Sequence, residues 1–266
     1  MKPSQIIVLS LSVAAACSSQ PSPATPKANP EPAQRAAEKP LNKTDLGTLL
    51  KLTTRYAGQG DPTKAARYAS LAVKQYPDQP DAWAMLGLTE AQAGQLVECI
   101  ASYEKSLALG QKRREVFEQL ASVYDIQKRY ADAARIYRSY LTLEPSDPVM
   151  LHQLGLSLLG TGDLPAAIAH LTRAEKAMQS TGVPEDLYVD LGYAHIATDN
   201  WPTARGYLAK VFDPAKQKPM PLELLVSLLG SMTEPKAALE LIDTFGDQPP
   251  GPKLSQIRAH VATQVK

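Results

Sequence analysis

The apolar residues between positions 114 and 147 recur at the spacing of two short helices. Phe117, Leu120 and Tyr124 lie three and four residues apart, so they share one face of a first helix. A second run of apolar residues follows and ends at Pro145, because proline cannot continue a helical hydrogen-bond ladder and restricts the residue before it. The pattern predicts a pair of helices that pack through their apolar faces.

This pattern returns along the chain with a period of 34 residues. One column of the pattern holds a small residue, where two helix backbones must approach closely: Ala65, Cys99, Ala133, Ala167, Ala204 and Ala238. The predicted units are 46–79, 80–113, 114–147, 148–181, 185–218 and 219–252. Three inserted residues precede the fifth unit, and the sixth is degenerate.

Large, small and proline residues at these offsets resemble the tetratricopeptide repeat. The resemblance implies an all-α fold, a right-handed superhelical solenoid of about six helix pairs over 46–252. In such an array each repeat contacts its neighbours, and there is no single globular core.

The last predicted element is a capping helix over 253–266. Leu254, Ile257, Val261 and Val265 fall on one helical face, while the other face is polar. A solenoid needs such a helix to cover its last repeat and turn a polar face to water. The alternative is a helix that lies on a membrane surface.

The first 16 residues have the character of a secretory signal. An apolar run from Ile6 is as long as a signal-peptide core and too short to cross a bilayer. Small residues then precede Cys17, which resembles a bacterial lipoprotein signal, although Ala14 stands where Leu is commonest. The resemblance implies a lipidated (palmitate-bearing) Cys17 as the mature first residue. Because Ser18 follows where Asp would imply inner-membrane retention, it also implies the outer membrane, facing the periplasm. The alternative is an ordinary signal peptide beside an incidental cysteine.

Residues 17–45 link this cysteine to the array. They are rich in Pro, Ala and Ser and hold almost no apolar side chain larger than Ala. Such a composition cannot bury enough surface to offset its conformational entropy, so we expect a disordered tether. Its simplest role is that of a spacer.

Composition and motifs argue against several classes of function. The formal charge of +1 gives no electrostatic basis for binding nucleic acid. The four histidines lack metal-ligand spacing, and neither a nucleophile elbow nor a phosphate-binding loop occurs. Cys99 falls in the small-residue column, where a buried apolar role is expected. The sequence therefore predicts a protein that is not an enzyme and has no cofactor, metal site or small-molecule substrate.

The resemblance assigns partner binding to a concave groove lined by the first helix of each repeat. Carried onto this sequence, the candidate groove residues are Asp81, Leu88, Glu115, Glu118, Ser122, Asp125, His152, Leu156, Asp186 and Tyr193. They are mostly acidic or apolar, and the groove offsets contain no Lys or Arg. Such a groove favours a basic or amphipathic protein segment. Alternatively, Leu156, Leu159 and Ile196 pack between neighbouring repeats.

The functional hypothesis is a membrane-anchored adaptor or scaffold. Lipoproteins with six such repeats are similar to the pilotins of type IV pili, which assist assembly of an outer-membrane secretin. The alternative is a general envelope scaffold for outer-membrane or peptidoglycan-enzyme complexes.

Overall fold

The computed structural model describes residues 44–216, 218–246 and 251–265. Within these residues the protein is all-helical, with thirteen α-helices and no strand, which confirms the predicted fold class. The predicted signal sequence, Cys17 and nearly all of the predicted tether lie outside the described residues. The chain divides into two compact units, whose described parts are 44–127 and 128–265.

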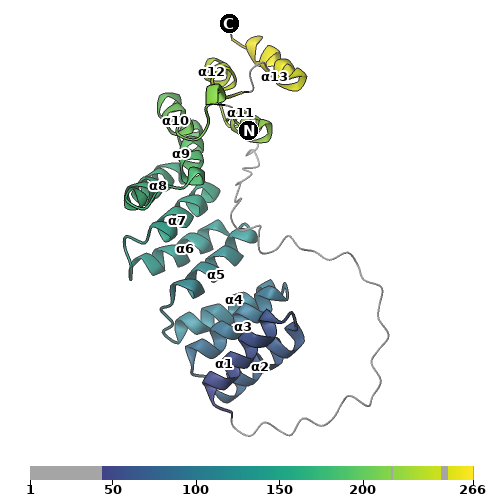
Figure 1. Ribbon diagram of the computed structural model, residues 1–266. Coiled ribbons are helices and arrows are strands. Elements are labelled where there is room, and N and C mark those ends of the chain that lie inside the picture. Colours follow the sequence, from purple (N-terminus) through teal and green to yellow (C-terminus); the bar gives the residue numbers. More distant parts are fainter. Residues whose placement is uncertain (1–43, 217, 247–250, 266) are drawn as a thin grey trace, which may run out of the picture. The chain divides into compact units, whose positions relative to one another are not determined.

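The unit 44–127 contains two helix pairs and a fifth helix (Figure 1). Its helices are α1 (Leu46–Gly58), α2 (Pro62–Gln75), α3 (Pro80–Gln92), α4 (Leu96–Ala108) and α5 (Arg114–Ile126). Each helix packs against the next, and α3 also contacts α1 and α5. First helices thus touch first helices, as neighbouring repeats of a solenoid do.

The small-residue column explains this close packing. Ala65 and Cys99 are fully buried. Burial raises the pKa of the Cys99 thiol to about 12, with nearby Glu90 as a smaller cause. The expected apolar role of Cys99 is confirmed. At Gly87 a Cβ atom would lie 3.0 Å from the ring of Tyr103, so α3 and α4 leave almost no room for a side chain there.

The unit 128–265 begins with α6 and ends with α13. Its helices are α6 (Tyr130–Leu141), α7 (Pro148–Thr161), α8 (Leu164–Met178), α9 (Glu185–Ala197), α10 (Trp201–Leu208), α11 (Leu222–Leu229), α12 (Pro235–Phe245) and α13 (Pro252–Ala262), with a 3-10 turn at Pro214–Lys216. From α6 to α10 each helix packs against the next, and α7 also contacts α9.

Local sequence sets where α7 begins and ends. Asp147 accepts hydrogen bonds from the backbone N–H groups of Val149 and Met150, both at 3.0 Å, and Pro148 occupies the first turn. The helix ends at Gly162, whose φ of 83° is left-handed and favours glycine.

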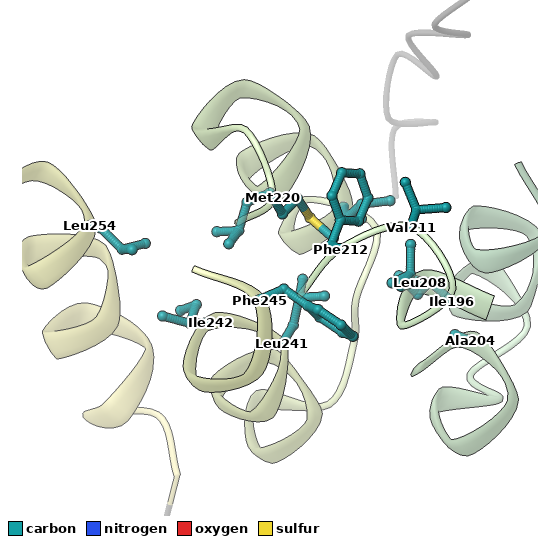
Figure 2. Packing of buried hydrophobic residues seen from close by; sticks show 12 residues of the cluster. Ile196, Ala204, Leu208, Val211, Phe212, Met220, Leu241, Ile242, Phe245 and Leu254 are labelled. Carbon is teal, nitrogen blue, oxygen red and sulfur yellow. The ribbon is translucent and has the colours of Figure 1, made fainter. Parts of the chain in front are cut away.

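The end of the chain packs as one apolar cluster (Figure 2). Leu254 of α13 is directed toward Ile242 of α12, and Ile257 and Val261 are partly buried against the same cluster. The predicted terminal helix is therefore present. The expected place of Val265 on its packed face is wrong, because α13 ends at Ala262 and Val265 is 41% exposed.

Candidate functional site

The predicted groove residues divide between the two units. Six of them lie on α3 and α5 of the unit 44–127: Asp81, Leu88, Glu115, Glu118, Ser122 and Asp125. Four lie on α7 and α9 of the unit 128–265: His152, Leu156, Asp186 and Tyr193. The predicted groove residues are therefore not carried by one unit.

Two arginines compensate the acidic residues of the unit 44–127. Arg113 places Nη1 3.6 Å from Asp81 Oδ1 and Nε 3.7 Å from Glu115 Oε2. Arg114 places Nη2 3.6 Å from Glu118 Oε2. Exposed pairs of this kind contribute only about 0–1 kcal/mol to stability. The two arginines offset part of the negative charge of the five carboxylates on α3 and α5.

Sequence reasoning missed this compensation because it counted only the groove offsets. Arg113 is the N-cap of α5 and Arg114 is its first residue, and neither position belongs to the groove pattern. Gln111 adds a further contact, since its Nε2 donates to Asp81 Oδ1 at 2.8 Å. Asp81 is thus held by two side chains from the loop that precedes α5.

The first helices of the unit 128–265 have a different charge pattern. Together α7, α9 and α11 hold four carboxylates, Glu185, Asp186, Asp190 and Glu223, and no lysine or arginine. Asp186 and Glu223 are exposed. Glu185 accepts a hydrogen bond from Lys218 Nζ at 2.5 Å. Negative charge on this face is only partly compensated.

Asp190 forms a half-buried pair with His152 that joins α9 to α7. His152 Nε2 lies 2.6 Å from Asp190 Oδ2, and the two side chains are 12% and 19% exposed. Burial raises the pKa of Asp190, although the hydrogen bond to His152 acts in the opposite direction. Nearby Asp186 raises it further. His152 thus acts in packing between neighbouring first helices.

A lysine in the turn that follows α10, Lys210, is engaged elsewhere. Lys210 Nζ lies 4.3 Å from the ring centroid of Tyr188 and 4.6 Å from that of Tyr207. It also donates to Glu175 Oε1 at 2.9 Å. His195 stacks on Tyr207 with ring centroids 5.6 Å apart. This cluster links α8, α9 and α10 and satisfies the charge of Lys210 internally.

The apolar candidates differ in exposure. Leu156 is 8% exposed, and Leu159 and Ile196 are 3% and 2% exposed, so all three belong to the packed interior. For them the packing alternative describes the structure, because neighbouring helices cover their side chains. Tyr193 is partly buried against the terminal apolar cluster, and Leu88 is also half-buried. These two retain surface that a partner can contact.

The described residues contain neither a metal-binding cluster nor a membrane-spanning helix. In the part of the chain that the structure describes, no three His, Cys, Asp or Glu side chains gather closely enough to hold a metal ion. None of the described helices combines the length and the apolar character needed to cross a bilayer.

Comparison with known proteins supports the repeat assignment. MamA (41-end) from Desulfovibrio magneticus RS-1 superposes with a TM-score of 0.56 at 20% identity, covering 64% of this chain and 94% of that chain. YrrB, described as a TPR protein with an unusual peptide-binding site, gives a TM-score of 0.55 at 16% identity, covering 76% and 94%. At these identities the likeness concerns the fold alone. No curated protein matches the chain.

A family model described as tetratricopeptide repeat matches residues 50–114 and 152–219, one stretch mainly in each unit. The predicted resemblance to the tetratricopeptide repeat is thereby confirmed, and the fold is consistent with an adaptor that acts through protein–protein contacts. Because these two stretches make up half of the sequence, the chain belongs to the tetratricopeptide repeat family.

Proposed function

We propose that the chain is an adaptor that binds a basic, amphipathic segment of another protein on the unit 128–265. The observation that carries this proposal is the charge of the first helices, α7, α9 and α11, which hold four carboxylates and no lysine or arginine. We call the side of α9 that holds Asp186, Val189, Asp190 and Tyr193 the α9 face; Asp186 is exposed and the other three are partly buried.

The α9 face combines charge with apolar surface. Asp186 and Asp190 are one helical turn apart, and burial keeps Tyr193 and Val189 only partly exposed beside them. Within the described residues no lysine or arginine pairs with Asp186, or with Glu223 on α11. Uncompensated carboxylates attract a basic segment and speed its association, and half-exposed apolar side chains give it a surface to bury.

The fold relatives are compatible with peptide binding. YrrB is described as having an unusual peptide-binding site, and its likeness covers most of this chain. The likeness supports the class of function, an adaptor that holds a protein segment. The choice of a basic segment rests on the charges of this chain alone.

We also propose that the adaptor is anchored through a lipid on Cys17 to the outer membrane, facing the periplasm. The support is the apolar run from Ile6 followed by small residues and the cysteine. Our first candidate for the bound complex is an outer-membrane assembly such as a type IV pilus secretin. A general envelope scaffold is the alternative.

The anchor is tested by replacing the cysteine. Cys17→Ser should release the protein from membranes, because each buried acyl CH₂ contributes about 0.8 kcal/mol and a multi-chain anchor is close to permanent. Membrane fractionation gives the answer. A Cys17→Ser protein that still sediments with the outer membrane contradicts the proposed anchor.

The binding face is tested by photo-crosslinking in cells. Tyr193 is replaced by a photo-reactive phenylalanine analogue, which keeps an aromatic ring at that position. The control carries the same analogue at Arg205, an exposed residue of α10. We expect a discrete cross-linked protein from position 193 and none from position 205. Equal cross-linking from both positions would move the binding surface away from α9.

A further inference from the structure

A small pocket opens between two turns of the unit 128–265, the turn from α9 to α10 and the turn from α11 to α12. Ile196, Trp201 and Met232 form its apolar wall. Asp199 and Glu234 bring carboxylates to it, one from each turn. The pocket is small and open, with a cavity volume of about 30 Å³, so it receives only the tip of a side chain.

Hydrogen bonds fix the shape of this pocket. Thr233 Oγ1 donates to Asp199 Oδ1 at 2.6 Å, which ties one turn to the other. Trp201 Nε1 donates to Glu240 Oε2 at 2.6 Å, which holds the indole ring in the wall. Asp199 has a φ of 55°, a left-handed conformation that Asp and Asn adopt more readily than most residues. The wall and one carboxylate are therefore positioned before any partner arrives.

Both carboxylates remain available to a ligand. Asp199 uses Oδ1 for the bond to Thr233, and within the described residues its other oxygen has no partner. Glu234 is the N-cap of α12 but makes no side-chain capping bond. Lys236 lies two residues further on and forms no ion pair with Glu234 in the described structure. The pocket thus presents negative charge beside an aromatic ring.

We propose that this pocket binds an arginine side chain of the partner segment, an inference that rests on the proposed function. The guanidinium group is planar, stacks on an indole ring and bonds carboxylates through two donors at once. Its aliphatic stem lies against the partly exposed part of the apolar wall, Trp201 and Met232. An acidic side chain is excluded by repulsion from Asp199 and Glu234.

The position of the pocket fits one continuous binding path. Ile196 stands one turn beyond Tyr193 on α9, so the pocket begins where the α9 face ends. A segment that lies along Asp186 and Tyr193 reaches Asp199 with its next residues. The pocket then fixes the register of the segment by accepting arginine at one position.

The test follows the indole N–H signals of the full chain by ¹H–¹⁵N NMR. The probe is an acetylated, amidated Gly-Ala-Arg-Ala-Gly peptide, and the matched control carries neutral citrulline in place of arginine. The chain has two tryptophans, and Trp83 in the other unit serves as an internal control. We expect the Trp201 signal to shift saturably with the arginine peptide while the Trp83 signal stays fixed.

Charge removal should weaken this binding. Citrulline, or the double variant Asp199→Asn with Glu234→Gln, should reduce the affinity about tenfold or more, since each charge-assisted bond lost has about that effect. Asn at 199 retains the acceptor for Thr233 and tolerates the left-handed backbone. An unmoved Trp201 signal, or equal shifts with citrulline, overturns the proposal.

Failure of the pocket is distinguishable from failure of the proposed function. If Asp186→Lys with Glu223→Lys abolishes partner cross-linking but the Asp199 and Glu234 variants do not change it, the pocket proposal is overturned and the α9 face stands. If the arginine peptide shifts Trp201 while cross-linking ignores Asp186 and Glu223, the pocket stands and the proposed function fails.

Discussion

The two units share one repeat pattern and differ in how their first helices handle charge. In the unit 44–127, Arg113 and Arg114 lie beside the carboxylates of α3 and α5. In the unit 128–265, Asp186 and Glu223 are exposed without such partners among the described residues. The same helix-pair packing therefore supports one face on which arginines pair with three carboxylates and another on which two exposed carboxylates have no such pair. The buried positions of the repeat determine the fold, whereas the side chains at the exposed positions determine what each unit can bind.

A second difference concerns histidine. The unit 44–127 contains none, whereas the unit 128–265 contains all four. Burial lowers the pKa of His170 and of His195. In each, Nδ1 is buried without a hydrogen-bond partner in the described structure. The titration of histidine should thus make the stability of the unit 128–265 depend on pH. The unit 44–127 should show no such histidine dependence.

The largest expected difference between the units comes from equivalent glycines. A Cβ atom on Gly155 would lie 2.5 Å from Leu171 Cδ2, inside a fully buried contact, whereas one on Gly87 would lie 3.0 Å from the Tyr103 ring. Gly155→Ala should destabilise its unit by about 1–3 kcal/mol. Gly87→Ala should change stability by no more than about 1 kcal/mol, because better helix propensity offsets the tighter contact.

Each unit has one tryptophan to report this effect. Denaturant unfolding is followed through Trp201 in a Trp83→Phe background and through Trp83 in a Trp201→Phe background. Equal losses from the two alanine substitutions would show that the helix pairs are packed alike, contrary to the contacts described above.

Ion pairs provide the next comparison. Asp190→Ala leaves His152 without its 2.6 Å partner in a half-buried site, and we expect a loss of about 1–3 kcal/mol. Asp81→Ala breaks an exposed contact with Arg113 at 3.6 Å and the 2.8 Å hydrogen bond from Gln111, for which about 1 kcal/mol is expected. The same two fluorescence reporters measure both variants. A larger loss at Asp81 would reverse the roles assigned to the two pairs.

The smallest expected effect is a pH dependence confined to the unit 128–265. Because the folded pKa of His170 and His195 lies below the unfolded value near 6.5, their contribution is fully present above pH 6.5. It is lost as the pH falls from there through the folded pKa. Asp190, whose folded pKa is raised, acts in the opposite sense, so stability attributed to it is lost as the pH rises from its unfolded pKa.

Unfolding midpoints between pH 7.5 and 6 test this dependence. The Trp201 midpoint should fall with pH, and the double variant His170→Gln with His195→Gln should flatten the curve. The Trp83 midpoint should stay level. A fall of equal size in both midpoints would remove histidine as the cause.

Packing could be predicted from the sequence because it repeats. The column from Ala65 to Ala238 marks the points where helices meet, and the structure buries its members. The degenerate sixth unit is where the pattern gave least guidance. There α11 has only eight residues, and the large apolar side chain of Val226 is 43% exposed.

The candidate site was harder to predict because it depends on side chains outside the repeat. Arg113 and Arg114 reach the acidic residues from the start of α5, and no groove offset includes them. The arginine pocket joins Asp199 to Thr233, which are 34 residues apart in sequence and belong to loops. The repeat offsets specify positions on helices. They do not specify which residues two turns bring together, so this site could be found only from the structure.

The central claim is that partner binding depends on the acidic first helices of the unit 128–265. It is tested most directly by measuring how much partner is cross-linked in cells from the photo-reactive residue at position 193. Asp186→Lys with Glu223→Lys should abolish capture, whereas the matched reversal Glu115→Lys with Glu118→Lys in the other unit should leave it intact, both with unchanged melts. Capture that survives the first pair of substitutions and is lost with the second would contradict the account.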